Sequence, residues 1–197
     1  MKIKTEMKKY LLIAGCLLFI LNFSFSQQGT YKPKSLTTNF WSLGIDGGAT
    51  IPLGTFKDTY SVGGNVGLEL SFNTTRKFAL VCDIQLNFLS TKDTSYSGTS
   101  SYVEGTVGGR YLLGKGPMQF FGEAALGDYI YDYSLVEIDG NITTYSKHNL
   151  GVYGGMGVNF SASARSAFFL KAKYHHVFTS GSPTNYIGLY AGLKFII

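Results

Sequence analysis

Apolar and polar residues alternate along most of this chain, and this alternation restricts the fold more than any other feature of the sequence. A two-residue period places apolar side chains on one face of a β-strand and polar side chains on the other. No stretch shows a convincing helical period, so the sequence predicts an all-β fold with eight strands. The alternating runs cover residues 41–51, 65–72, 78–88, 103–113, 118–127, 149–160, 168–175 and 186–197.

A large aromatic residue stands at the same end of the apolar face in each run. These residues open the odd-numbered runs and close the even-numbered ones, so an antiparallel meander places all of them at one rim. The eight aromatic residues are Trp41, Phe72, Phe78, Tyr111, Phe120, Phe160, Phe168 and Phe195. An aromatic rim on a closed sheet is typical of a membrane–water boundary. The sequence therefore predicts an eight-stranded antiparallel up-and-down transmembrane β-barrel.

The connections between the runs alternate in length. Residues 73–77, 114–117 and 161–166 form short connections. Longer connections, rich in Tyr, Ser, Thr, Gly and Asp, are expected at residues 52–62, 91–100, 130–146 and 179–185. Short turns at one end and long loops at the other are typical of membrane barrels.

The first 26 residues have the features of a secretory signal peptide. The positive start consists of Lys2, Lys4, Lys8 and Lys9. Residues 10–21 form an apolar core that is too short for a transmembrane helix, and residues 24–26 offer a small-residue cleavage site. We therefore expect a signal peptide at 1–26, a flexible leader at 27–39 and one β-barrel domain at 40–197.

The cysteine count argues against a fold held by disulfides, and the net charge argues against nucleic-acid binding. Cys82 is alone once the signal is removed, so no internal disulfide holds the fold. Residues 13–16 resemble a lipoprotein cleavage box, which would place a lipid on Cys16, but the apolar run continues past that cysteine. Residues 1–26 hold four of the 17 Lys and Arg and one of the 12 Asp and Glu, leaving a net charge of +2. Nucleic acid is therefore not an expected partner.

The apolar face is expected to point outward. An eight-stranded barrel has an interior just wide enough for side chains to fill, and the many large apolar residues of this chain would overpack it. The polar face is also sparse in charge and rich in Gly, unlike an ordinary solvated surface. A soluble ligand-binding barrel, with the apolar face inside, is the alternative.

If the polar face lines the lumen, its charged side chains need partners, because an unpaired buried charge costs several kcal/mol. The acids come from the first five strands and most of the bases come from the last two. Closing the barrel brings these two walls together, which predicts a structural network that plugs the lumen. The predicted network comprises Asp46, Glu69, Asp83, Glu104, Arg110, Glu123, Lys171, Lys173 and Lys194.

Two local motifs carry a resemblance to a known family. Residues 190–197, YAGLKFII, are similar to the terminal signal read by the barrel-assembly machinery, and residues 51–56, IPLGTF, resemble a turn common in the family. With the eight runs, residues 40–197 resemble a small porin-family outer-membrane β-barrel of the OmpA/OmpX-like group. The resemblance implies insertion into the outer membrane from the periplasm, contact with outer-membrane lipid and recognition of the C-terminal strand by the assembly machinery. It does not imply one activity.

His175 and His176 are the strongest candidates for catalysis. His175 is expected to face the lumen near the outer rim, and His176 to face lipid or the interface. Some outer-membrane barrels modify lipid A with a His and a nearby Ser, and in the deacylase type the Ser follows two positions later. Val177 and Phe178 occupy those positions here, while Ser180 and Ser182 lie beyond. A catalytic base must lie within hydrogen-bond reach of its nucleophile. The sequence places no such nucleophile for either histidine, so no catalytic residue is predicted.

The connection at 130–146 is the other candidate site. Four acids lie in or beside it, Asp128, Asp132, Glu137 and Asp139. Their spacing matches no dedicated cation loop, so we predict no metal and no cofactor. The Tyr-rich stretch formed by Tyr129, Tyr131, Tyr133 and Tyr145 is expected to extend the flanking strands above the membrane. Tyr suits contact surfaces, so the stretch and the long loops are also a candidate surface for an extracellular partner.

The expected function is a non-enzymatic structural or surface-interaction role in the outer membrane, with a polar and largely plugged lumen. A narrow passive porin-like channel is the first alternative, and a lipid A-modifying barrel enzyme is the second. The sequence does not identify a ligand, a partner or an oligomeric state.

Overall fold

The structure is a computed structural model that describes residues 39–92, 99–114, 116–136 and 142–197, and of residues 99–100, 132–136 and 142–145 it describes the backbone alone. The expected signal peptide and almost all of the expected leader lie outside these residues.

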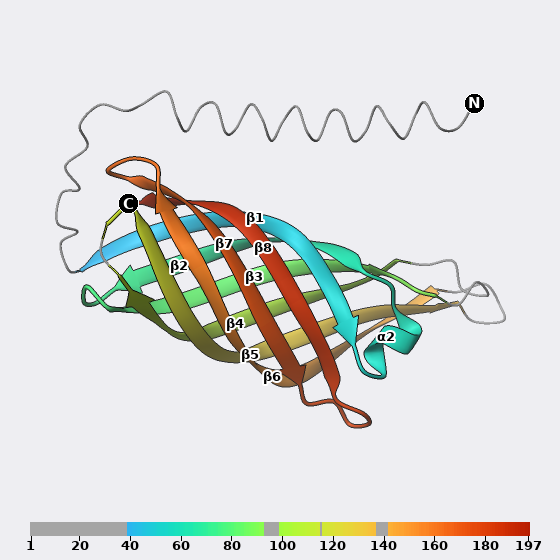
Figure 1. Ribbon diagram of the computed structural model, residues 1–197. Coiled ribbons are helices and arrows are strands. Elements are labelled where there is room, and N and C mark those ends of the chain that lie inside the picture. Colours follow the sequence, from blue (N-terminus) through green and yellow to red (C-terminus); the bar gives the residue numbers. More distant parts are fainter. Residues whose placement is uncertain (1–38, 93–98, 115, 137–141) are drawn as a thin grey trace, which may run out of the picture. The chain divides into compact units, whose positions relative to one another are not determined.

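Eight antiparallel strands form a closed barrel in which each strand pairs with the next and the last pairs with the first (Figure 1). This confirms the predicted eight-stranded up-and-down barrel. The strands are β1 (Phe40–Leu53), β2 (Gly63–Asn73), β3 (Phe78–Ser90), β4 (Thr99–Leu113), β5 (Met118–Val136), β6 (Ile142–Ser161), β7 (Ser166–Val177) and β8 (Thr184–Ile196).

The two ends of the barrel differ, as the lengths of the connections predict. At the short-turn end, the turns span residues 74–77, 114–117 and 162–165. The turn between β4 and β5 depends on Gly114 and Gly116, whose φ angles of 93° and 116° lie in the left-handed region that favours glycine. The other end, which carries the longer connections, is called the loop end.

The prediction that no segment is helical is wrong at one place. Residues 56–59, inside the expected loop at 52–62, form the short helix α2 (Phe56–Thr59). Phe56 is buried against the end of the barrel, whereas the other three residues are exposed. One buried side chain in four residues is too short a pattern to reveal a helical period.

The connection expected at 130–146 is also mostly strand. Pairing between β5 and β6 continues from Ile130↔His148 to Val136↔Ile142, so the two strands form a long hairpin at the loop end. This confirms the expectation that the Tyr-rich stretch extends these strands. The hairpin tip, residues 137–141, lies outside the described residues.

Along every strand, the side chains that the structure describes alternate between two faces. On β3 the odd-numbered residues Ala79 to Leu89 are buried and the even-numbered residues Phe78 to Ser90 are exposed. Exposed apolar side chains include Leu80, Ile84 and Leu86, while Asp83, Gln85 and Asn87 are buried. The apolar face therefore points outward, and the soluble barrel with an apolar interior is ruled out. No helix in the described part of the chain is long and apolar enough to cross a membrane.

Candidate functional site

Lys171 lies at the centre of the buried charges in the lumen. It points inward from β7, and its Nζ lies 2.9 Å from Asp46 Oδ2, 2.9 Å from Glu69 Oε2 and 3.3 Å from Asp83 Oδ1. The Lys171 side chain is fully buried. Three carboxylates around one ammonium offset the loss of hydration that an unpaired buried charge would suffer.

Arg110 joins two further strands to this centre. Its terminal nitrogens donate to Glu69 Oε1 and Oε2 at 2.8 and 2.7 Å, and its Nε donates to Glu123 Oε2 at 2.7 Å. The guanidinium also lies 4.2 Å from the centre of the Phe121 ring. The guanidinium is a planar fork of N–H donors, so it binds both oxygens of Glu69 and also reaches Glu123. The ammonium group of a lysine has no such fork.

Two further lysines complete the group, which we call the charged network. Lys173 Nζ lies 2.9 Å from Asp83 Oδ2 and 3.6 Å from Glu123 Oε1, and Lys194 Nζ lies 2.6 Å from Glu69 Oε1. The network thus contains eight of the nine residues predicted for it. Its members are Asp46, Glu69, Asp83, Arg110, Glu123, Lys171, Lys173 and Lys194.

Glu104 is the predicted member that the structure places apart. It is buried in the lumen on β4, and the hydroxyl of Tyr186 donates to its Oε2. The imidazole of His175 lies beside it, with Nδ1 3.6 Å from Oε2. Among the described residues, no lysine or arginine is ion-paired with Glu104.

Aromatic side chains fill the lumen on the loop-end side of these charges. This loop-end cluster consists of Phe56, Leu89, Tyr102, Tyr129, Val177 and Tyr186, with Tyr60 and Tyr131 packed against it. Tyr102 stacks on Tyr131 at 4.9 Å between ring centres and meets Tyr186 edge-on at 5.5 Å. Tyr129 is therefore fully buried in the barrel interior and offers no surface to a partner, whereas Tyr131 is only partly buried against the cluster. The side chains of Tyr133 and Tyr145 lie outside the description.

Apolar residues fill the lumen on the short-turn side. Val81, Leu112, Phe121 and Phe169 are all buried there. Phe121 and Phe169 fit because the residue paired with each on the adjacent strand is a glycine. A Cβ at Gly157 would lie 2.4 Å from the Phe121 ring, and one at Gly192 would lie 2.5 Å from the Phe169 ring. The charged network thus lies between the loop-end cluster and these apolar residues, and the burial of its side chains strengthens its ion pairs.

The eight aromatic residues predicted for one rim all lie on the outward face near the short-turn end. Trp41 on β1 and Phe72 on β2 are paired, with 4.7 Å between their ring centres. Phe160 on β6 and Phe168 on β7 are also paired, at 6.2 Å. Outward aromatics also occur near the loop end, where Phe88, Tyr174 and Phe178 are exposed. These three were not assigned to a rim from the sequence.

The two histidines lie on opposite faces of β7. His175 is fully buried, with Tyr129 OH 3.0 Å from Nδ1 and Tyr190 OH 3.2 Å from Nε2. His176 faces outward, and its Nδ1 donates to Asn185 Oδ1 at 2.7 Å. Ser180 instead accepts a hydrogen bond from Lys147 at 2.7 Å. Within the described part of the chain, no serine hydroxyl is hydrogen-bonded to either histidine.

The acids near the β5–β6 hairpin do not form a described site. Asp128 is paired with His148 at 2.6 Å on the exposed outer face. The side chains of Asp132, Glu137 and Asp139 lie outside the description. In the parts of the chain that are described, no group of three or more His, Cys, Asp and Glu side chains is arranged to hold a metal ion.

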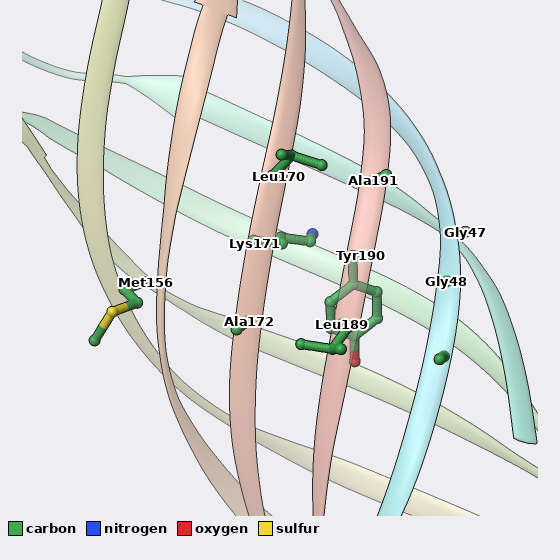
Figure 2. Close-up of a pocket in the computed structure, with 10 residues that line it drawn as sticks. Gly47, Gly48, Met156, Leu170, Lys171, Ala172, Leu189, Tyr190 and Ala191 are labelled. Carbon is green, nitrogen blue, oxygen red and sulfur yellow. The ribbon is translucent and has the colours of Figure 1, made fainter. Parts of the chain in front are cut away.

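A hollow of about 510 Å³ lies on the outward wall over β1, β6, β7 and β8 (Figure 2). Small residues, Gly47, Gly48, Ala49, Ala172 and Ala191, form part of it, and Met156, Leu170 and Leu189 border it. Lys171 and Tyr190 also line it, but both side chains are buried in the lumen. The hollow is therefore apolar and offers no catalytic group.

Sequence reasoning missed the uncharged part of the lumen filling. Tyr102, Phe121 and Phe169 lie on the inward face with the charged residues and fill the barrel on either side of them. Their positions in the two-residue period could have identified them. The expected polar lumen did not include these three residues.

The sequence matches no protein-family model and no curated protein. Solved structures are similar in fold. Neisserial surface protein A has a TM-score of 0.60 at 12% identity, over 79% of this chain and 96% of that protein. Ail of Yersinia pestis, in complex with the heparin analogue sucrose octasulfate, has a TM-score of 0.52 at 17% identity, over 81% and 100%. The outer membrane protein OprG of Pseudomonas aeruginosa has a TM-score of 0.50 at 12% identity, over 81% and 97%. The chain therefore has the fold of a bacterial outer-membrane β-barrel, as its resemblance to that group predicted.

Proposed function

We propose that this chain is exported by a signal peptide at residues 1–26 and resides in the outer membrane as an integral β-barrel. Three observations support this location: the closed barrel, the apolar outward wall and the aromatic residues at its short-turn end. In this arrangement the short turns lie in the periplasm and the loop end lies outside the cell. The terminal strand β8 is the element read by the barrel-assembly machinery.

The lumen of the protein is closed, and its charged network is structural. The observation that carries this proposal is the enclosure of eight paired ionic side chains between the loop-end cluster and the apolar layer below. A conducting pore would need a continuous path of water past these groups. The network instead holds β1, β2, β3, β4, β5, β7 and β8 together through side chains.

Ion conductance in planar lipid bilayers tests the closed lumen. We expect the purified protein to give no steady openings. A double variant, Lys171→Ala with Lys173→Ala, removes two central cations, and we expect openings to appear if that variant folds. Leu170→Ala with Ala172→Gly, on the outward face of the same strand, is the matched control. Steady openings of the unmodified protein would contradict the closed lumen and favour the narrow channel.

The role in the membrane is non-enzymatic and depends on the surface presented by the loop end. The long hairpin of β5 and β6 extends that surface, and we propose that it meets an extracellular partner. Protease treatment of intact cells should cleave this hairpin and spare the turns at residues 74–77 and 162–165. Cleavage only after the outer membrane is broken would contradict this orientation.

The lipid A-modifying enzyme is tested separately. Mass spectra of lipid A from cells with and without the protein should be identical, because His175 lies among tyrosines inside the barrel. A change in lipid A that disappears with His175→Ala would overturn the non-enzymatic role.

A further inference from the structure

The acids buried in the lumen outnumber the lysines and arginines there by one. Among the described residues, five carboxylates, from Asp46, Glu69, Asp83, Glu104 and Glu123, face four cations, from Arg110, Lys171, Lys173 and Lys194. All of the acids except Glu104 have a lysine or arginine within 3.6 Å. The excess negative charge therefore falls on Glu104.

Among the described residues, no lysine or arginine forms an ion pair with Glu104 that would compensate this charge. Its Oε2 accepts a hydrogen bond from the Tyr186 hydroxyl, but its Oε1 is buried and has no hydrogen-bond partner. Tyr102, Tyr129 and Tyr186 of the loop-end cluster shield it from solvent. Burying an ionised carboxylate without an ion pair costs far more than burying the neutral acid, because the charged form loses much more hydration free energy.

His175 is the remaining base near Glu104, but its surroundings favour a neutral imidazole. It follows Lys173 by two residues on the inward face of β7, so both would place positive charge in the same part of the lumen. Tyr186 stacks on the ring at 4.3 Å between centres, with Tyr153 at 5.2 Å. The Tyr129 and Tyr190 hydroxyls reach one ring nitrogen each, at 3.0 and 3.2 Å, which satisfies a neutral ring with one donor and one acceptor.

The remaining charge in this region is already balanced. Asp83 on β3 is paired with Lys171 and Lys173, and Glu123 on β5 is paired with Arg110. Neither lysine has an ion pair with Glu104 in the described structure. A proton on Glu104 is therefore the simplest way to make the lumen neutral.

We infer that Glu104 is held as a protonated carboxylic acid in the folded barrel at neutral pH, with the proton on Oε1, and that it forms an alkaline-sensitive switch beneath the loop-end cluster. Raising the pH removes this proton, leaves one uncompensated negative charge in the lumen, and loosens the tyrosine packing above it. Because this buried charge destabilises the folded state, the stability of the barrel falls as pH rises. This inference rests on the closed lumen proposed above.

Infrared spectroscopy of the folded protein in lipid vesicles tests the inference. At neutral pH, the C=O stretch of a buried carboxylic acid should be present in the unmodified protein, absent in Glu104→Gln and retained in Glu69→Gln. The band should disappear reversibly on raising the pH. Absence of the band at neutral pH, or its persistence in Glu104→Gln, would overturn the inference.

Stability measurements provide a second test, which does not use the control variant Glu69→Gln. Glutamine mimics the neutral acid, so Glu104→Gln should fold and should lose less stability towards urea than the unmodified protein between neutral and alkaline pH. Failure of Glu104→Gln to fold, or an unchanged pH dependence, would contradict the inference. Neither test depends on conductance, so a conducting lumen with a protonated Glu104 would overturn the closed lumen alone.

Discussion

The two sides of the same strands are stabilised in different ways. On the outward side, each apolar residue contacts its strand neighbours and the surroundings of the barrel, and its contribution depends mainly on its own depth in the membrane. On the inward side, residues far apart in sequence act together, as Lys171 and Glu69 do across 102 positions. The comparison teaches that the outward side tolerates single changes, whereas the inward side depends on the intact set.

The largest effect is expected from removing the branching cation of the lumen. Arg110→Ala removes the guanidinium that donates to both Glu69 and Glu123. Removing one partner of a buried ion pair costs about 3–5 kcal/mol. Urea unfolding in lipid vesicles, followed by the shift in gel migration of the unheated protein, measures the loss. Leu113→Ala, three residues later on the outward face, is the control. Equal losses for the two variants would break the proposed difference between the two sides.

A charge placed on the outward side should cost less, and its cost should depend on depth. Ile84 lies halfway along the outward face of β3, and Ile84→Lys is expected to cost about 2–4 kcal/mol. Leu113 lies near the short-turn rim, so Leu113→Lys should cost about 0–1 kcal/mol. The same urea experiment compares the two variants. A lysine tolerated equally well at both positions would show that the wall does not face hydrocarbon.

Adding one methyl group at two positions of β6 compares the inward and outward sides of a single strand. In Gly157→Ala the new Cβ would lie 2.4 Å from the Phe121 ring and 2.5 Å from the Leu170 carbonyl oxygen. Such overpacking costs about 1–3 kcal/mol. Gly154→Ala is the control, because a Cβ there has no atom within 4 Å. The urea midpoints of the two variants should differ, and identical midpoints would show that the lumen has room to spare.

The smallest effect is expected at the rim. Trp41 and Phe72 form a ring pair at 4.7 Å, and such pairs contribute about 0.5–1.5 kcal/mol beyond the area they bury. A double-mutant cycle of Trp41→Ala and Phe72→Ala in urea measures the coupling. A coupling energy of zero would show that the two rings act independently at the rim.

The outward side could be predicted from the sequence because its rule is local. The two-residue period at residues 78–88 assigns each side chain of β3 to a face without any knowledge of its neighbours. The same period identified eight members of the charged network, but it could not say that Lys171 would meet three acids. That outcome depends on how closure of the barrel sets the stagger between distant strands.

The loop end was the least predictable region. Tyr129 and Tyr131 resembled loop residues in composition, yet the two-residue period continues through them and directs both side chains inward. Phe56 is buried by a helix of four residues, which is too short to leave a periodic signal. The separate position of Glu104 also depends on three-dimensional packing, because in sequence it looks like the other acids.

The central claim is that apolar side chains face lipid while ionisable side chains fill the lumen, and Cys82 allows a direct test. It is free and exposed on the outward face of β3, next to the buried Asp83. A spin label on Cys82 in lipid vesicles should be relaxed by oxygen, which dissolves in hydrocarbon, and protected from a water-soluble nickel complex. Stronger relaxation by the nickel complex than by oxygen would place this face in water and contradict the account.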